Sequence, residues 1–312
     1  MGRYIANRVF WFVPTMILLI ALTFTILKLT PGTGVVPAGA QIVTQDQIEG
    51  LKRHYGLDKP LYQQFGIYVA NAVQGDFGES FQYRGQTVSS IISRTFPISL
   101  RLGAFATLFA VVVGLTLGVL AAVNQNGALD YLSVTMAILF YSLPNFVMGF
   151  LLILLLAVWL PGQGINLGFN IGGVQGWRDW ILPTIALGAA PLATIARYTR
   201  SSVIEAIRSD YVRTARAKGL SEGRVVTKHV LKNALIPVLT LIGPIFAAVG
   251  TGSFFVEEVF NIPGMGPYFV ESITAKDQPM VLAVVLIYGV FLAVMNLVVD
   301  VLYGFIDPRI RY

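Results

Sequence analysis

The sequence contains no cysteine among its 312 residues and only two histidines, His54 and His229. Without cysteine, the chain cannot form disulfides, thiolate metal sites or a cysteine nucleophile. Two histidines so far apart in sequence do not indicate a metal site. Charged residues are also scarce, because Asp, Glu, Lys and Arg make up 12% of the chain, against about 25% in an average soluble domain. A water-soluble fold is therefore not expected.

Sequence motifs for catalysis are missing as well. The phosphate-binding pattern G-x-x-x-x-G-K-[ST], the nucleophile turn G-x-S-x-G and the zinc pattern H-E-x-x-H do not occur. The apolar stretches also lack the charged pairs that proton-relay pumps require. We therefore expect a chain that is not an enzyme and that binds no metal or cofactor of its own. If it transports actively, its energy must come from another protein.

The chain is instead rich in apolar residues, which make up 55% of it and give a mean hydropathy of +0.70. A helix needs roughly 20 apolar residues to cross a bilayer core of about 30 Å. The first such stretch is expected to be a retained anchor, because it exceeds a signal-peptide core and lacks a cleavage site. Pro183 and Pro191 are expected to interrupt the fourth. The six predicted spans of this all-α polytopic membrane protein are Val9–Leu29, Ile98–Val123, Leu132–Leu160, Trp180–Ala196, Leu235–Val256 and Met280–Tyr303.

The distribution of Lys and Arg between the spans predicts which segments face the cytoplasm. Six spans place both termini on one side, where the segments hold thirteen Lys and Arg residues, and the longer opposite segments hold seven. The positive-inside rule therefore places both termini in the cytoplasm. Topology accounts for the surplus positive charge, so nucleic acid is not an expected partner. The segments on the two sides are 1–8, 124–131, 197–234 and 304–312 against 30–97, 161–179 and 257–279.

The 30–97 segment is long enough to form a small external subdomain. Thr44 and Gln47 form a possible capping box for a first helix, and the pattern from Pro60 to Gly75 predicts a second helix. The Gly-rich residues 76–86 predict a turn. This subdomain either caps the outer mouth of the bundle or helps to receive a partner, and the residues leave both roles open.

Small and polar residues mark further positions in or near the spans. Paired Pro-Gly and Gly-Pro turns around Met265 predict a re-entrant elbow within 257–279. Polar groups inside a membrane are candidates for function, and the candidates for the substrate pathway are Tyr141, Asn145 and Asn296. Small residues in the fifth span are expected to allow close helix approach; they are Gly243, Ala247, Gly250 and Gly252.

The basic stretch "DYVRTARAKGLSEGRVVTKHVLKNALIP", residues 210–237, interrupts the apolar sequence. Asp210 is the expected N-cap of a short helix that ends at Gly219, and Ser221 is expected to begin a second helix. The short helix could bind anionic lipid through its basic residues. Its apolar face, however, carries a small residue, Ala215, where lipid-binding helices carry bulky ones. That composition favours docking into a groove of another protein.

Four stretches occur in the order and spacing of one known family. They are "RYIANRVFWFVPTMILLIALTFTILKLTPG", "YGLDKPLYQQFGIYVANAVQGDFGESF", "DYVRTARAKGL" with "HVLKNALIPV", and the carboxy-terminal residues 256–312 that begin "VEEVFNIPGMGPYF". With these stretches the chain resembles the membrane permease subunits of binding-protein-dependent ABC importers. It is most similar to the B-type subunit of the dipeptide, oligopeptide and nickel branch. The resemblance covers nearly the whole chain and implies the type I importer permease fold.

The cytoplasmic EAA loop of this family is matched with departures. Ala215 and Gly219 fit the superfamily pattern, whereas Arg213 stands at the Glu position and Thr214 at the next Ala. The later Ile-x-Leu-Pro element keeps only Leu231. This variant is typical of the peptide branch, so the docking role is still implied, while a salt bridge from the missing Glu is not.

The resemblance implies that residues 210–222 form a coupling helix that is seated in a groove of a separate ATPase subunit. Tyr211, Ala215, Gly219 and Leu220 are the expected contact face. The residues expected to take part in coupling are Asp210, Tyr211, Arg213, Ala215, Ala217, Gly219 and Leu220.

The same resemblance implies a domain organisation and a set of partners. Residues 1–94 are expected to hold the first span and the external loop, 95–304 the permease core with the 197–234 coupling loop, and 305–312 a cytoplasmic tail. The expected partners are a sister permease, two ATPase subunits or domains that bind ATP and Mg²⁺, an external solute-binding protein and the lipid bilayer of the cell membrane.

The implied function is import of dipeptides or oligopeptides. The chain carries no metal ligands and no dense acidic or basic lining that would choose among the family's other solutes, so a nickel complex, glutathione or an oligosaccharide stays open as the cargo. Two other classes compete with this function. An ion-coupled carrier would work without ATPases, and a membrane-embedded hydrolase would need a Ser, His or Asp constellation that the spans do not contain.

Overall fold

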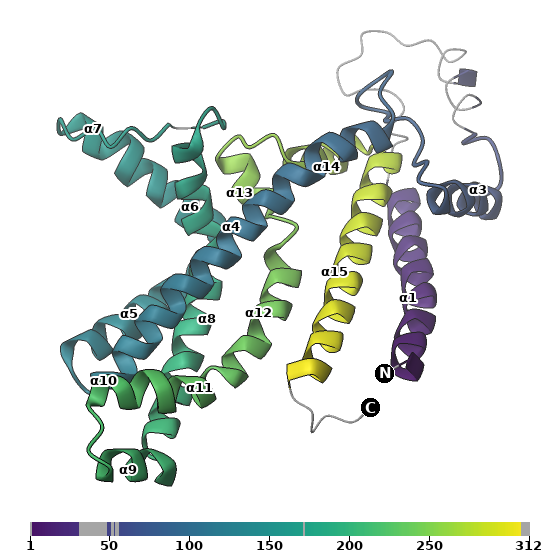
Figure 1. Ribbon diagram of the computed structural model, residues 1–312. Helices are drawn as coiled ribbons and strands as arrows, with labels where there is room; N and C mark the ends of the chain where they lie inside the picture. The colour runs from purple at the N-terminus through teal and green to yellow at the C-terminus, as the bar shows by residue number, and fades with distance from the viewer. Residues whose placement is uncertain (1, 31–48, 51–52, 54–55, 171, 307–312) are drawn as a thin grey trace. The chain divides into compact units, whose positions relative to one another are not determined.

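The computed structural model describes residues 2–30, 49–50, 53, 56–170 and 172–306, and helices dominate this part of the chain (Figure 1). Within these residues, β-structure is confined to a single isolated bridge between Glu79 and Thr87. The predicted all-α class is therefore confirmed. The possible capping box of Thr44 and Gln47 lies outside the described residues, as does most of the 305–312 tail.

Five helices of the described chain are long and apolar enough to cross a membrane, and a bent helix pair makes a sixth. The predicted multi-pass architecture is thus confirmed, with differences in individual spans. The first and sixth spans match α1 (Gly2–Leu29) and α15 (Gln278–Ile306). The second lies in α4 (Val88–Val123), which begins ten residues before the predicted start at Ile98.

The third predicted span, Leu132–Leu160, is wrong as one continuous helix. The structure divides it into α5 (Ala128–Ser142) and α6 (Asn145–Leu152), which continues through the π-helix η1 (Ile153–Trp159) into α7 (Leu160–Gly162). Pro144 causes the division, because proline lacks an N–H group and disfavours helical backbone in the residue before it. Leu143 is accordingly extended, with φ −88° and ψ 127°.

The fourth predicted span, Trp180–Ala196, was expected to be interrupted by its prolines, and the structure shows a continuous and longer helix instead. After the 3₁₀ turn η2 (Trp177–Trp180), α8 runs without a break from Ile181 to Ile207. Pro183 lies in the first turn, where backbone N–H groups have no partner within the helix. Pro191 lies in the interior, and tertiary packing keeps the helix intact there, since thirteen residues of α8 are buried.

The fifth predicted span, Leu235–Val256, contains a bend and a break. The pair Glu222–Ala234 and Ile236–Val249 is bent by 53°; it consists of α10 (Glu222–Arg224), the π-helix η3 (Val225–Val230) and α11 (Leu231–Ala234), followed by α12 (Ile236–Val249). α12 ends at Val249. Gly252, three residues later, has a φ of +77°, a conformation that glycine adopts readily. The short helix α13 (Phe254–Val259) then begins at its N-cap, Ser253.

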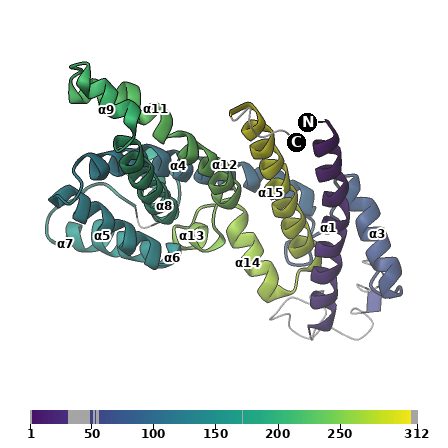
Figure 2. The same ribbon diagram turned by 90° about the horizontal axis from the view of Figure 1, so that it is seen from below.

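The chain forms two compact units. Residues 1–99 and 263–294 form the first, and residues 100–262 and 295–312 form the second. In the first unit, α1 and α15 lie side by side (Figures 1 and 2), and Gly289 of α15 faces Met16 and Leu19 of α1.

The outer part of the first unit contains the predicted second external helix, α3 (Leu61–Val73). Pro60 precedes it and Gly75 follows it with φ +80°, so its predicted bounds are confirmed. α3 packs through its aromatic side chains against an apolar cluster that the two membrane helices share. The cluster comprises Ile20, Phe24 and Leu282, with Leu27, Phe65, Tyr68 and Leu286 packed against it.

The 76–86 turn is tied by hydrogen bonds to residues far away in sequence. The fully buried Asp277 carboxylate accepts hydrogen bonds from the Ser80 hydroxyl and, at 3.2 Å, from the Gln82 N–H. The Tyr83 hydroxyl donates to Glu271 in α14 (Met265–Ala275). Burial, aided by this hydrogen bond, raises the pKa of Tyr83 above its ordinary value.

The predicted elbow around Met265 is partly wrong. Gly266 and Pro267, expected to form a turn after Met265, belong to the first turn of α14. Proline is tolerated there because the first N–H groups of a helix lack intrahelical partners. Met265 itself is fully buried, and its backbone N–H donates to Ser99 Oγ at 2.8 Å.

In the second unit, α4, α8 and α12 approach one another closely at glycines. A Cβ on Gly118 of α4 would lie 2.6 Å from Thr199 Cβ of α8, and one on Gly103 would overlap the backbone of Val249 and Gly250. Gly243 of α12 leaves similarly little room beside Val299. Close helix approach at Gly243 and Gly250 is thereby confirmed. This packing makes α8 the buried centre of the unit.

Candidate functional site

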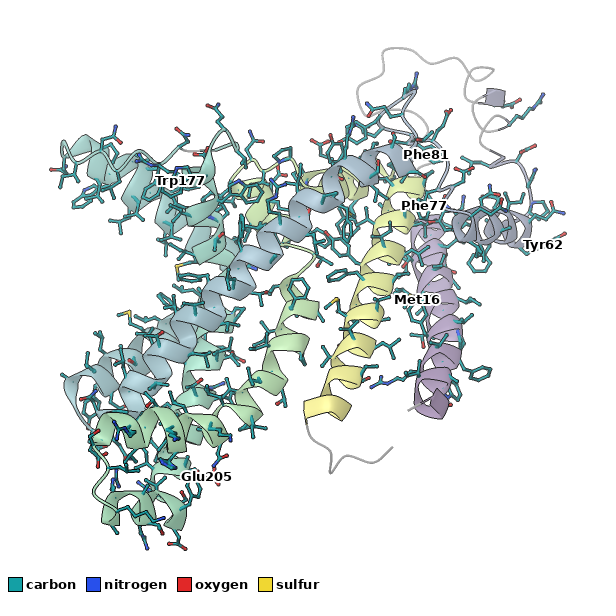
Figure 3. All side chains as sticks on the ribbon, in the orientation of Figure 1. Met16, Tyr62, Phe77, Phe81, Trp177 and Glu205 are labelled. Atoms are coloured by element: carbon teal, nitrogen blue, oxygen red, sulfur yellow. The ribbon has the colours of Figure 1, made fainter. Side chains whose placement is uncertain are left out.

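The predicted coupling helix is α9 (Asp210–Ala217), which lies at the end of α8 together with α10 and α11 (Figure 1). Trp177 of η2, which precedes α8, and Glu205 near the end of α8 are labelled in Figure 3, and α9 follows the Glu205 end. Asp210 was expected to be the N-cap, but that residue is Ser209, which has extended backbone with ψ 154°. Asp210 is the first helical residue and forms an ion pair with Arg213 at 3.3 Å.

Gly219 ends the helix as predicted. Its N–H donates to the carbonyl of Arg216 at 2.9 Å, and its φ is +75°, a left-handed conformation that glycine adopts without a Cβ penalty. A Cβ added at Gly219 would meet no atom within 4 Å. Backbone conformation therefore explains this glycine, and close packing within the chain does not. Ser221 then precedes α10 as its N-cap, as predicted.

The inner face of α9 is buried against the chain itself. Val212 is fully buried and Ala215 is 4% exposed. Both belong to an apolar cluster, named here the base cluster, that joins α9 to α4, α8, η3 and α11. Its buried members are Ala122, Val203, Ala206, Val212, Ala215, Val225, Val230 and Ala234, and Leu220 packs against them.

The base cluster corrects the predicted contact face. Ala215 and Leu220 were expected to meet a partner protein, yet Ala215 faces the interior of this chain and Leu220 is half-buried against the same cluster. Small size at position 215 lets α9 lie close to η3. The sequence suggested an apolar face but did not show that the chain itself covers this face.

The outer face of α9 carries the remaining predicted coupling residues. Asp210, Tyr211, Arg213, Ala217 and Gly219 are all exposed. Tyr211 is a large aromatic side chain with 42% of its surface accessible. The outer face therefore combines an aromatic ring, charged groups and a small residue.

An ion pair closes the turn between α9 and α10. Arg216 Nε and Nη2 donate to the two carboxylate oxygens of Glu222 at 2.8 and 3.1 Å. These hydrogen bonds raise the pKa of Arg216 above its ordinary value. Both side chains are exposed, so solvent screens the pair and its contribution to stability is small.

A second, more buried ion pair joins α5 to α8. Arg200 Nε and Nη2 donate to the two oxygens of Asp130 at 2.5 and 2.7 Å, and the Asp130 side chain is 5% exposed. The N–H of Asn126, which has a φ of +63°, also donates to Asp130 at 2.9 Å. Sequence reasoning missed this pair because its two residues lie seventy positions apart and each occurs alone.

The three predicted pathway residues contact different partners. The Tyr141 ring lies below the guanidinium of Arg197, 5.5 Å from centroid to carbon. Asn145 donates from its side-chain amide to Ser253 Oγ at 3.3 Å, so it links α6 to the start of α13. Asn296 is a half-buried residue of α15. Tyr141 lines a cavity of about 310 Å³ with Arg197 and Arg200, and the described lining of this cavity includes neither asparagine.

Metal and cofactor sites were not expected from the sequence. Within the residues that the structure describes, no group of three or more His, Cys, Asp or Glu side chains is placed to hold a metal ion.

The sequence matches two family models. Residues 114–312 match the family described as "Binding-protein-dependent transport system inner membrane component", and residues 1–103 match the family that describes the N-terminal part of such components.

Curated permeases match this chain in sequence over its whole length. The dipeptide transport system permease protein DppB of Lactococcus lactis subsp. cremoris is 45% identical over 100% of both chains. The oligopeptide transport system permease protein OppB of Haemophilus influenzae is 40% identical, again over 100% of both. The glutathione transport system permease protein GsiC of Escherichia coli is 41% identical with the same coverage.

Two solved structures share the fold at low sequence identity. One is an amino acid ABC transporter, with a TM-score of 0.53, 16% identity and coverage of 69% of this chain and 93% of that one. The other is the MetNI methionine ABC transporter in inward-facing conformations, with a TM-score of 0.52, 20% identity and coverage of 70% and 97%. At such identities the likeness concerns the fold alone.

Proposed function

Because this chain belongs to the family of binding-protein-dependent transport system inner membrane components, we propose that it is the permease subunit of an ATP-driven importer of dipeptides or oligopeptides. Family membership and the apolar helices establish a multi-pass membrane protein with the type I importer permease fold, as the sequence predicted. The proposal that the substrate is a peptide rests on one observation: the chain is 38–45% identical over its full length to dipeptide and oligopeptide permeases.

The proposed importer contains further proteins. The family description names a binding protein, and the curated relatives are each one permease of a transport system. This chain forms half of the pathway with a sister permease, and separate ATPase subunits bind and hydrolyse ATP with Mg²⁺. The chain itself performs no catalysis. Its two termini and α9 are proposed to face the cytoplasm, which the distribution of Lys and Arg favours.

In this proposal α9 couples the ATPase to the permease. Its outer face, with Tyr211, Arg213 and Ala217, meets the ATPase surface. Its inner face is held by Val212 and Ala215, which are buried with side chains of α8, η3 and α11. Cores are densely packed and transmit displacement with little compression. A movement imposed on α9 therefore passes to α8 and to the bent pair that leads into α12.

Reconstitution tests the proposal. The permease pair, the ATPases and the binding protein are placed in liposomes, and uptake of a labelled dipeptide is measured with ATP and with a non-hydrolysable analogue. ATP-dependent uptake supports the proposal. Peptide uptake that persists without the ATPases would indicate an ion-coupled carrier and would contradict it.

The cargo is tested in the same liposomes by competition. A tenfold excess of unlabelled dipeptide, glutathione, nickel complex or oligosaccharide is added, and the competitor that abolishes uptake identifies the class. Glutathione is included because a glutathione permease is 41% identical over the full length. Abolition by an oligosaccharide alone would refute the peptide substrate.

The external 76–86 turn is proposed to help receive the binding protein. Its fixed attachment through Asp277 and Glu271 makes it a defined surface that a partner can recognise. Replacing residues 76–86 by a short flexible linker is expected to weaken binding-protein docking, as measured by surface plasmon resonance. Unchanged docking would remove this role.

A further inference from the structure

Two arginines on α8, one helical turn apart, have different partners. Both lie in a helix that is long and apolar enough to cross the membrane. Ionisable residues in such helices are costly, face cavities or partners, and mark functional positions. Arg200 is neutralised by the bidentate Asp130 carboxylate. Arg197 stacks on the Tyr141 ring instead, and no carboxylate of the described residues pairs with it.

The Arg197 guanidinium, which pairs with no carboxylate in the described part of the chain, opens onto a cavity. Residues of α4, α5 and α8 line a partly open cavity of about 310 Å³, and most of the lining is apolar. Arg197 and Arg200 lie on one wall, and Ser133, Tyr141 and Ser142 of α5 supply hydroxyl groups. A mostly apolar cavity with a few convergent polar groups is the usual form of a small-molecule site. This one carries a net positive charge, because Asp130 neutralises only one of its two arginines.

From this arrangement we infer that Arg197 binds the carboxylate of the transported peptide as it passes through the permease. The inference rests on the proposed function and identifies a residue that determines specificity within it. A guanidinium pairs with a carboxylate through two parallel N–H···O bonds, the arrangement that Arg200 and Asp130 already form one turn away. The Arg197 guanidinium lies over the Tyr141 ring, 5.5 Å from guanidinium carbon to ring centroid, which is within the range of a cation–π interaction. This interaction uses none of the N–H groups of Arg197 as hydrogen-bond donors to a carboxylate.

The C-terminal carboxylate is a group that the site could recognise in peptides of any sequence. Every unmodified peptide carries one at its C-terminus, so recognition there is independent of the side chains. The three hydroxyl groups of α5 can hydrogen-bond to peptide amides. The proposed function makes a peptide the occupant, and an anionic lipid is an outcome of the test.

The test compares a dipeptide with its C-terminal amide in the reconstituted importer. The same binding protein serves every variant, so a change in the ratio of acid to amide uptake reports on the permease. Arg197→Gln is expected to lower uptake of the free acid at least tenfold, because the carboxylate then enters a mostly apolar cavity without its bidentate partner. Uptake of the amide is expected to stay within about twofold. Arg197→Lys, which keeps the charge without the planar fork, is expected to fall between wild type and Arg197→Gln.

The matched control is Arg178→Gln. Arg178 also lies over an aromatic ring, Trp177 at 5.5 Å, but it belongs to η2, which precedes the opposite end of α8, and it lies outside this cavity. It is expected to leave the acid-to-amide ratio unchanged. Size-exclusion chromatography of each complex shows whether the variant assembles.

Other outcomes overturn the inference. Equal loss of acid and amide uptake in Arg197→Gln would assign Arg197 a structural role, and an unchanged ratio would remove it from substrate recognition. Loss of a co-purified anionic lipid in native mass spectrometry, with the ratio unchanged, would make the cavity a lipid site. If wild-type protein imports neither the acid nor the amide in the presence of ATP, the proposed function fails, and this inference fails with it.

Discussion

The 76–86 turn and the α9 helix are both polar segments outside the spans, yet different forces hold them. The turn is fixed chiefly by hydrogen bonds to the buried Asp277 carboxylate, in addition to the burial of Phe81. α9 is fixed by the burial of small apolar side chains in the base cluster. Hydrogen bonds are directional and fix one geometry, whereas apolar contact is non-directional and tolerates small shifts of one surface over another. The comparison suggests that the turn is a fixed surface and that α9 is a segment suited to transmitting movement.

The largest expected effect comes from overfilling the base cluster. Ala215→Leu adds three carbon atoms to a site that is 4% exposed, and overpacking of this kind costs about 1–3 kcal/mol. We expect a lower melting temperature of the isolated permease and loss of ATP-driven uptake. The control for the melting temperature is Ala217→Leu, two residues along the same helix and exposed. Uptake is not compared for this variant, because Ala217 lies on the proposed ATPase-facing side. An equal change in melting temperature for both variants would contradict the assignment of the two faces.

The corresponding change in the turn is Asp277→Asn. The amide keeps the size of the side chain but replaces one acceptor oxygen by a donor. Oδ2 of Asp277 accepts from the Ser80 hydroxyl and the Gln82 N–H, and Oδ1 accepts from the Met280 N–H, so in either orientation of the amide one set of donors loses its acceptor. Leaving buried polar groups unsatisfied costs about 1–3 kcal/mol. Hydrogen exchange of residues 76–86 is expected to accelerate, while exchange of α9 stays unchanged. Faster exchange in both segments would mean that the two are not held independently.

A smaller effect is expected at the end of α9. Gly219→Leu and Gly223→Leu both place a side chain in open space, but only Gly219 has a positive φ. The strain at Gly219 is expected to cost about 1 kcal/mol and to uncouple ATP hydrolysis from uptake while the permease still assembles. Gly223→Leu is the matched control and is expected to retain coupling. Normal uptake in Gly219→Leu would rule out a role for this turn in coupling.

The smallest effect is expected from Arg216→Gln. The ion pair with Glu222 is exposed at both ends, and such pairs contribute little because water and salt screen them. The melting temperature in moderate salt is expected to stay within the error of the measurement. A clear decrease would show that hydrogen bonds, and not only apolar burial, hold α9 in place.

Local sequence signals predicted the elements whose determinants are local. Pro60 and Gly75 bounded α3, Gly219 ended α9, and Ser221 began the next helix. The long apolar runs predicted α1 and α15 because membrane length depends on composition alone. The roles in coupling and the cytoplasmic orientation stay predictions, since neither a partner nor a membrane is part of the structure.

One error, at Pro144, was local, and the others arose where distant residues decide the outcome. Hydropathy does not register the helix break at Pro144. The break expected from Pro191 does not occur, because tertiary packing keeps α8 continuous there. The apolar face of α9 was recognised, but only η3 and α8 reveal that Ala215 faces inward. Arg197 was counted as a loop residue because the predicted span ended at Ala196, so its position beside Tyr141 could not be anticipated.

The unbroken length of α8 has a mechanical consequence. Its 27 residues make a rod about 40 Å long at a rise of 1.5 Å per residue. One end bears the base cluster, and the other carries Trp180. A tilt of about 5° about one end of such a rod moves the opposite end by about 3.5 Å, a displacement comparable to the width of a methyl group. A break at Pro191 would let the two halves of α8 tilt separately, and a tilt at one end would no longer displace the other. Because α8 is continuous, a tilt at the base cluster moves the whole helix as one rigid body.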